Sequence, residues 1–175
     1  MASRTTSENE TYSFHPLDQK YKLWYHDNDN QDWSIDSYKE LMLIETIEDY
    51  WMTYEKMSNK IINNTMLFLM KEGVLPTWED PQNINGGCIS IKLPFKEASK
   101  LWQELVIYMI ASKLEGNVLG ISISPKKSFN IIKIWVPEEI EDIKTYKFPE
   151  TFNLDNKLIL FRIHKTNIEK DKLKK

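Results

Sequence analysis

Residues 95–136 read FKEASKLWQELVIYMIASKLEGNVLGISISPKKSFNIIKIWV and carry the clearest structural pattern in the chain. The first half predicts a long helix over residues 95–114, with Gly116 beyond its end as a stop signal. Residues 118–124 and 130–136 are rich in Ile and Val and predict two strands. The loop between these strands has hairpin length, which favours antiparallel pairing.

Further strands and helices are predicted on both sides of this stretch. Thr46 and Asp49 have the spacing of a capping box, and apolar side chains then recur at helical intervals, which predicts a helix over residues 46–60. A short third helix is expected in PEEIEDIKTY, residues 137–146, because Pro137 and an acidic first turn favour a helix start. The other expected strands are residues 21–26, 38–44, 66–70, 88–93 and 157–163.

This mixed order of strands and helices favours an α+β fold, an antiparallel sheet with its helices on one face and the opposite face free. Residues 1–13 are polar and predict a flexible N-terminal tail, and the Lys-rich residues 168–175 predict a frayed C-terminal tail. The domain between them covers residues 14–167. With 175 residues, 41% of them apolar and 28% charged, one compact soluble domain is expected.

Composition excludes several classes of protein. No apolar run approaches the about 20 residues that a membrane span needs, and the N-terminus lacks the hydrophobic segment of a signal peptide. The single cysteine, Cys88, rules out an internal disulfide, which fits a cytoplasmic protein. Because the three histidines and Cys88 have no ligand spacing, no metal or other cofactor is expected.

The net charge of −3 argues against a protein that holds long nucleic acid by phosphate contacts alone. This charge does not exclude a short ligand that is recognised by stacking. Trp33 and Trp78 lie in polar loops, without the apolar neighbours of a buried indole. A single such tryptophan would be read as a core residue under its loop, but two of them, with Glu79 adjacent, favour a site that grips a flat ring.

Six motifs then show a resemblance to a known family. They are HPLDQKYKLWY (15–25), DWS (32–34), TIEDYWMTY (46–54), LPTWEDPQNINGG (75–87), LWQELV (101–106) and IIKIW (131–135). In order and in tryptophan spacing they resemble the eukaryotic translation initiation factor 4E family of mRNA cap-binding proteins, from His15 to His164. The resemblance implies a curved antiparallel sheet of about eight strands backed by three helices on its convex face, with the 7-methylguanosine cap on the concave face.

The resemblance also implies roles for the base-binding residues. Trp33 and Trp78 sandwich the methylated base, Glu79 accepts hydrogen bonds from its N1 and N2 protons, and Trp135 touches the methyl group. Methylation at N7 makes the base a delocalised cation, so two indoles attract it more than they attract guanine. A carboxylate that faces two N–H donors also rejects adenine, whose edge offers no such pair.

The phosphate side departs from the family. Lys126 falls where the family has a phosphate-binding arginine, whereas Cys88, Ser128 and Ile131 stand at its other basic positions. Lys127 is a second candidate phosphate contact, although a solvated Lys-rich turn explains both lysines equally simply. A thinned phosphate clamp and a shallow salt dependence of binding are therefore expected.

A second surface also matches the family. In the family, a dorsal patch binds a Tyr-x-x-x-x-Leu-apolar helix of a scaffold initiation factor or a repressor. The resemblance places this patch at His15, Pro16, Leu17, Ile47, Trp51, Glu104 and Ile107. Residues 105–110 are all apolar and cover the whole circumference of a helix, which exceeds one core-facing stripe. Trp51 is equally consistent with a core position, and Gln103 stands where the family has an apolar leucine.

The sequence leaves three functions open. The leading one is a monomeric, non-enzymatic protein that binds the capped 5′ end of mRNA and recruits it to the initiation machinery. The alternative is a cap-binding repressor that sequesters mRNA without productive scaffold contact. An enzyme acting on caps would need the acidic run Glu138, Glu139, Glu141 and Asp142 as a metal site, and an acidic first helical turn explains that run more simply.

Overall fold

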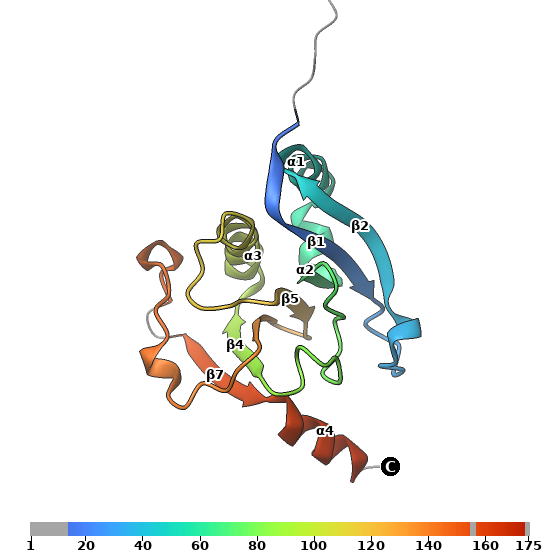
Figure 1. Cartoon of the computed structure of the whole chain (residues 1–175), viewed down its shortest axis with the longest axis vertical. Helices are drawn as coiled ribbons and strands as arrows, with labels where there is room; N and C mark the ends of the chain where they lie inside the picture. Colours follow the sequence, from blue (N-terminus) through green and yellow to red (C-terminus); the bar gives the residue numbers. More distant parts are fainter. Residues whose placement is uncertain (1–13, 155–156, 174–175) are drawn as a thin grey trace, which may run out of the picture.

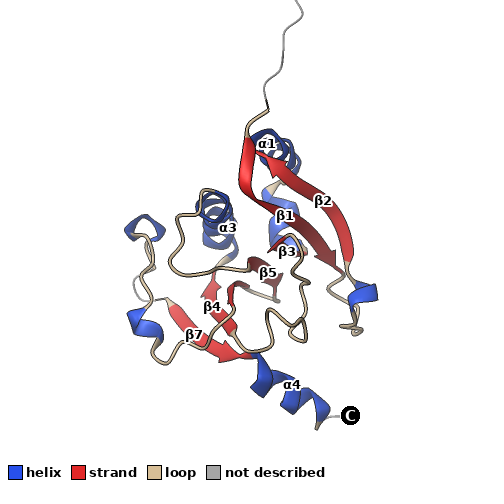
Figure 2. Ribbon diagram, in the orientation of Figure 1, coloured by secondary structure: helices blue, strands red, loops and turns tan. Residues whose placement is uncertain are grey.

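A curved antiparallel sheet of seven strands forms the centre of the described part of the chain (Figures 1 and 2). The computed structural model describes residues 14–154 and 157–173. The strands lie in the order β2-β1-β3-β5-β6-β4-β7, and each neighbouring pair is antiparallel. They are β1 (Pro16–His26), β2 (Lys39–Thr46), β3 (Met66–Lys71), β4 (Gly87–Leu93), β5 (Gly120–Pro125), β6 (Asn130–Val136) and β7 (Leu158–Ile163).

Three helices pack on one face of this sheet, and a fourth extends from the end of β7 (Figure 1). They are α1 (Ile47–Lys56), α2 (Asn59–Asn64), α3 (Phe95–Ile110) and α4 (His164–Lys172). Short 3-10 turns occur at Ile35–Ser37, Ile143–Thr145 and Glu150–Phe152. The α+β fold class, with three helices backing one face of the sheet, is therefore confirmed. The described residues form seven strands rather than about eight, and α4 is an additional helix.

The helix predicted over residues 46–60 is two helices, α1 and α2. Its predicted start is confirmed: the Asp49 backbone N–H donates to Thr46 Oγ1 at 3.1 Å, and the Thr46 N–H donates to Asp49 Oδ2 at 2.9 Å. Ser58 has an extended backbone, and its hydroxyl accepts from the Ile61 N–H at 3.3 Å. Ser58 thus caps a new helix, and this cap divides the predicted one.

Helix α3 ends at Ile110, four residues before the predicted end at residue 114. Ser112 adopts a φ of 53°, in the left-handed region, and this backbone cannot continue a right-handed helix. The helix therefore stops before the Gly116 signal.

The C-terminal part differs more from prediction. The prediction of a third helix over residues 137–146 is wrong, because Asp142 keeps an extended backbone and only a 3-10 turn, Ile143–Thr145, follows. Helix α4 occupies much of the segment predicted to fray, and the predicted domain boundary at residue 168 falls inside it. The predicted tail of residues 1–13 lies outside the described residues.

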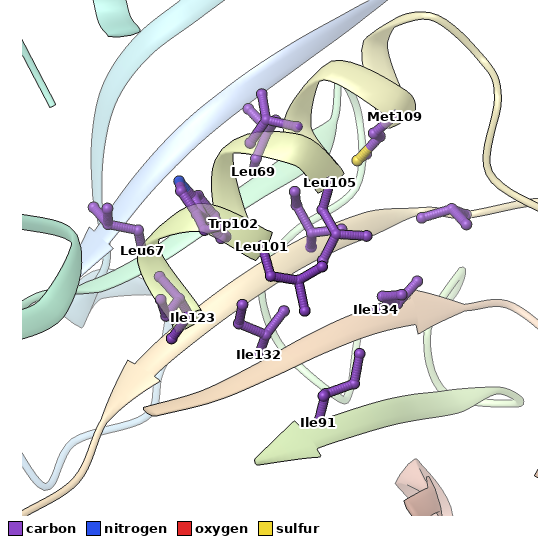
Figure 3. Close-up of a cluster of buried hydrophobic side chains, with 14 of the residues drawn as sticks. Leu67, Leu69, Ile91, Leu101, Trp102, Leu105, Met109, Ile123, Ile132 and Ile134 are labelled. Atoms are coloured by element: carbon purple, nitrogen blue, oxygen red, sulfur yellow. The ribbon is translucent and has the colours of Figure 1, made fainter. Parts of the chain in front are cut away.

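The main core lies between the helices and the sheet. Figure 3 shows Leu101, Trp102, Leu105 and Met109 of α3 over Leu67, Ile91, Ile123, Ile132 and Ile134 of the strands. Because side chains alternate along a strand, the intervening residues point to the other face. There Phe68, Cys88 and Trp135 form a second, smaller cluster, against which Trp24 and Trp78 pack. The sheet face without α1–α3 is thus aromatic.

Candidate ligand-binding site

A pocket of about 280 Å³ opens on this aromatic face. Its walls include the aromatic residues Trp33, Tyr38, Phe68, Trp78 and Trp135, the carboxylates Glu79 and Asp171, and the amines of Lys126 and Lys133. The structure thus brings together five residues that the sequence singled out separately, Trp33, Trp78, Glu79, Trp135 and Lys126. Lys127 is exposed in the β5–β6 turn and lines neither this pocket nor the adjoining groove.

Trp33 stacks on a buried histidine, His26. The indole stacks on the His26 ring with centroids 4.3 Å apart and planes 4° from parallel. His26 is fully buried at the end of β1, and its Nε2–H donates to the Asp32 carbonyl at 2.8 Å. Trp33 remains 49% exposed, so His26 supports one face of the indole and the other is available to a ligand.

Two buried polar side chains shape the loop that carries Trp78 and Glu79. The Asp80 carboxylate accepts from the Leu75 N–H at 3.1 Å and from the Gln82 N–H at 2.8 Å. The Asn83 amide donates to the carbonyls of Leu75 and Thr77, both at 2.8 Å. These hydrogen bonds satisfy backbone groups on either side of Trp78 that have no partner in a helix or strand, and so they fix the shape of the loop.

Trp135 forms the floor of the pocket. It is 2% exposed, and its Nε1–H donates to Ser122 Oγ at 3.0 Å, which fixes the indole. The His164 ring lies behind it, with centroids 5.0 Å from Trp135 and 6.3 Å from Trp78. Burial, and secondly the charge of Lys133, lowers the pKa of His164 to about 4, so the imidazole is neutral at pH 7.

Lys133 and His164 are two site residues that the sequence reasoning missed. The Lys133 Nζ lies 5.9 Å from the Trp78 ring centroid. A signal for Lys133 existed, since in IIKIW it alternates with Ile132 and Ile134 and shares a face with Trp135. For His164 the sequence offers no local signal, because its place depends on the pairing of β7 with β4.

Burial, and secondly the positive charge of Lys133, lowers the pKa of Lys126. Tyr38 is affected in the opposite direction: burial, with a smaller contribution from the Glu79 carboxylate, raises its phenol pKa above the usual range. The Tyr38 phenol is therefore neutral at pH 7.

Four of the seven residues predicted for the dorsal patch lie on helices α1 and α3. Ile47 and Trp51 of α1 are 41% and 49% exposed, and Ile107 of α3 is 42% exposed, although each is a large apolar side chain. Glu104, also on α3, pairs with Lys100 at 3.8 Å. Trp51 lies outside the buried core and contacts its neighbours on α1 at the helix surface.

The His15, Pro16 and Leu17 segment is tied to the start of α1. The His15 backbone N–H donates to Glu48 Oε2 at 3.0 Å, and the His15 carbonyl accepts from the Ile47 N–H at 2.9 Å. The His15 ring also contacts Glu48 Oε1 at 2.6 Å. Pro16 begins β1 opposite Thr46, and Leu17 packs partly against the core.

The acidic run 138–142 forms no metal-ligand cluster in this structure. Within residues 14–154 and 157–173, no three His, Cys, Asp or Glu side chains are grouped so that they could hold a metal ion. The Asp142 side chain instead accepts from the Lys144 N–H at 2.9 Å and caps the 3-10 turn. None of the helices in the described part of the chain has the length and apolar character needed to cross a membrane.

The chain is thus an α+β protein with an aromatic pocket on the sheet face that α1–α3 leave open. A model of the family described as Eukaryotic initiation factor 4E matches residues 16–175. The chain belongs to this family, as the sequence motifs indicated.

Curated relatives of the chain carry the names of this family. The translation initiation factor NCBP of Triticum aestivum is 32% identical over 129 residues, which cover 69% of this chain and 55% of that protein. Translation initiation factor 4E-3 of Caenorhabditis elegans is 24% identical over 182 residues, which cover 94% and 72%. The chain spans 55% to 58% of the length of the plant NCBP relatives it matches.

Solved structures have the same fold. One is C. elegans eIF4E-3 in complex with the 4E-binding protein Mextli and a cap analog, with a TM-score of 0.73, 20% identity, and coverage of 90% of this chain and 96% of that one. Another is Ascaris suum eIF4E-3 with an m2,2,7G cap, with a TM-score of 0.70, 23% identity, and coverage of 88% and 93%. At these identities the likeness shows the shared fold.

Proposed function

We propose that this chain binds the 7-methylguanosine cap of mRNA, with the methylated base between Trp33 and Trp78. The observation that carries this proposal is the pocket in which two loop indoles, Glu79 and Trp135 meet on one face of the sheet. Two of the solved relatives are described with a cap or a cap analog, which supports the same ligand class.

Each base-binding role has a physical reason. The exposed face of Trp33 and the ring of Trp78 offer π-electron density to a cationic base, and each stacking contact contributes about 1–3 kcal/mol. Glu79 is exposed at the pocket wall, where its two oxygens are free to accept the parallel N–H donors of the guanine edge. Trp135 at the floor presents a fixed apolar surface to the N7 methyl group.

Lys126 and Lys133 are the proposed contacts for the cap phosphates. Both line the ring pocket, and as lysines they act as point charges rather than as bidentate forks. Lys127, outside the pocket wall, is assigned a secondary, electrostatic contribution only.

The proposal extends to the helical face. The chain brings capped mRNA to the initiation machinery by binding a Tyr-x-x-x-x-Leu-apolar helix of a scaffold protein, at Ile47, Trp51 and Ile107. Their exposure supports this role, because helix-in-groove binding rests on a few apolar anchors. A solved relative is described in complex with a 4E-binding protein. In this proposal the chain acts in the cytoplasm as a monomeric binding protein and not as an enzyme.

A cap-binding repressor is the second candidate. It is favoured by the polar Gln103 on α3, at a position where the family has an apolar leucine. A weakened helical face would leave cap binding intact and reduce scaffold binding.

A fluorescence titration tests the proposed cap binding. Because Trp33 and Trp78 would stack on the base, 7-methyl-GTP should quench tryptophan emission at a concentration about tenfold or more below that needed for GTP. ATP should bind weakest, since its edge lacks the donors for Glu79. Equal affinities for 7-methyl-GTP and GTP would contradict the proposal.

A further inference from the structure

A second hollow adjoins the ring pocket on the same sheet face. It has a volume of about 360 Å³, and Trp78, Lys126 and Lys133 line both hollows, so the two are continuous. The second hollow extends across β6, β4 and β7, where Lys92 and Arg162 complete its set of basic side chains. We refer to it as the basic groove, defined by Lys92, Lys126, Lys133, Arg162 and the Phe129 ring.

The strand register places these cations on one face. Ser90 of β4 is opposite Lys133 of β6, and Cys88 of β4 is opposite Arg162 of β7. Cys88, Ser90 and Lys92 alternate along β4, so they point to the same side, and their cross-strand partners point there too. Lys92, Lys133 and Arg162 therefore lie together on the face that α1–α3 leave open.

The groove itself is lined by basic and not by acidic side chains. Within residues 14–154 and 157–173 no carboxylate lines it, and none of the ion pairs formed there includes one of its four basic side chains, although Glu79 and Asp171 line the adjoining ring pocket. Burial, and secondly the charge of the nearby Lys133, lowers the pKa of Lys126. Like charges held close together repel, and a bound polyanion would relieve that repulsion.

The groove also has an aromatic element and a defined end. The Lys92 Nζ lies 4.1 Å from the centroid of the Phe129 ring. Cations interleaved with an aromatic ring are typical of sites for single-stranded nucleic acid, which need both phosphate and base contacts. The next hollow, which Arg162 also lines, has the carboxylates of Glu141 and Asp142 beside the Lys170 amine, so the region lined by cations without carboxylates ends there.

We propose that the basic groove holds the phosphate backbone of the RNA nucleotides that follow the cap. This inference rests on the proposed function, since the ring pocket anchors one end of the RNA and the groove begins where Lys126 and Lys133 leave that pocket. A net charge of −3 does not oppose it, because the cations are local and the stacked ring supplies the anchor. The groove thereby replaces the thinned phosphate clamp with contacts further along the strand.

The test compares two double variants against three ligands by calorimetry. The groove variant is Lys92→Gln with Arg162→Gln, and the control is Lys96→Gln with Lys113→Gln, which removes equal charge from exposed positions outside the groove. The ligands are 7-methyl-GMP, a capped pentanucleotide, and the same pentanucleotide with an uncapped 5′-triphosphate. The groove variant should bind the capped pentanucleotide about tenfold more weakly near 0.1 M salt, with a log–log salt slope shallower by about 1.

Affinity for 7-methyl-GMP should be unchanged in both variants, and the control should match the wild type with every ligand. An unchanged affinity of the groove variant for the capped pentanucleotide would overturn the inference, as would a parallel loss for 7-methyl-GMP. Displacement of the RNA by a polyglutamate peptide at equal charge concentration would also overturn it, in favour of an acidic protein partner. If wild-type protein failed to prefer 7-methyl-GMP over GMP, the proposed cap binding would be wrong. Comparing the affinities of the groove variant and the wild type for the uncapped pentanucleotide would still show whether the basic groove binds RNA.

Discussion

Glu79 is the residue on which selectivity for guanine depends in the proposed complex. It is exposed at the pocket wall, next to Trp78 in a loop that Asp80 and Asn83 hold in place. Glu79→Gln should weaken binding of 7-methyl-GTP by about 1–3 kcal/mol, because one acceptor becomes a donor facing the N–H edge and the charge that complements the cation is lost.

Calorimetry on Glu79→Gln measures this loss, with Glu138→Gln, an exposed acid outside the pocket wall, as the matched control. Equal affinity of Glu79→Gln and wild type would mean that another edge of the base is bound.

His164 makes the stability of the fold depend on pH. Its folded pKa of about 4 is below the ordinary 6.5, so between these values the unfolded chain binds a proton that the folded chain does not. The stabilisation is complete above about pH 6.5 and is lost as the pH falls toward 4. We expect the unfolding free energy to drop by about 2 kcal/mol between pH 7 and pH 5 from this residue alone.

Urea unfolding at both pH values, in wild type and in His164→Gln, measures this difference. The variant should lose less stability than the wild type over the same interval, because glutamine does not titrate. The same pH dependence in both proteins would place the effect on other groups.

At the scale of elements, the loop of residues 74–86 depends on Asn83. Its amide satisfies two backbone carbonyls at 2.8 Å, and the side chain is fully buried. Asn83→Ala should lower the unfolding free energy by about 1–3 kcal/mol and weaken 7-methyl-GTP binding, because Trp78 and Glu79 lose their fixed position.

The neighbouring Gln82→Ala is the control, since Gln82 is exposed and its amide bonds only the Gly73 carbonyl. Denaturant unfolding measures the stability of both variants, and a titration with 7-methyl-GTP measures their affinity for the cap. Asn83→Ala that bound the ligand normally would show that the loop holds its shape without the amide.

Helix α1 carries the test of the second surface. Because Trp51 is 49% exposed and outside the core, Trp51→Ala should leave the melting temperature and cap affinity within error. It should weaken binding of a Tyr-x-x-x-x-Leu-apolar peptide by at least about 2 kcal/mol, as expected for a central aromatic anchor. Parallel loss of peptide binding, cap binding and melting temperature would make Trp51 a core residue instead, with a cost of about 3–5 kcal/mol.

Elements whose signals are local were predicted well, and those that depend on tertiary contacts were not. The capping box at Thr46 and the alternating strands can be recognised within a few residues of sequence. Helix α4 has no comparable signal: it begins at His164, whose backbone N–H donates to the Gly86 carbonyl at 3.0 Å and whose ring packs near Trp78 and Trp135. Those partners are brought together only when β7 pairs with β4.

At the scale of the whole molecule, the same distinction applies to the candidate site. Trp33, Trp78 and Glu79 stood out because their loops lack apolar neighbours, whereas Lys92, Lys133 and Arg162 gather only through the order β6-β4-β7. The shallow salt dependence of cap binding that the sequence predicts takes only Lys126 and Lys127 into account. The structure leads us to expect a shallow dependence for 7-methyl-GMP and a steeper one for capped oligonucleotides.

The two surfaces lie on opposite faces of one sheet, so a ligand on one face and a partner helix on the other need not compete. Between them lies the continuous core of Figure 3, in which Leu105 and the strand isoleucines are fully buried. This arrangement is why single substitutions on one face should leave the other face unchanged.

If Trp33 and Trp78 hold the methylated base between them, the calorimetric affinity for 7-methyl-GMP depends on both indoles. Trp33→Ala and Trp78→Ala should each weaken binding by about 1–3 kcal/mol with little change in melting temperature, and Trp51→Ala should not weaken it. Unchanged affinity of either loop variant together with a lowered melting temperature would show that these indoles are structural and do not sandwich the base.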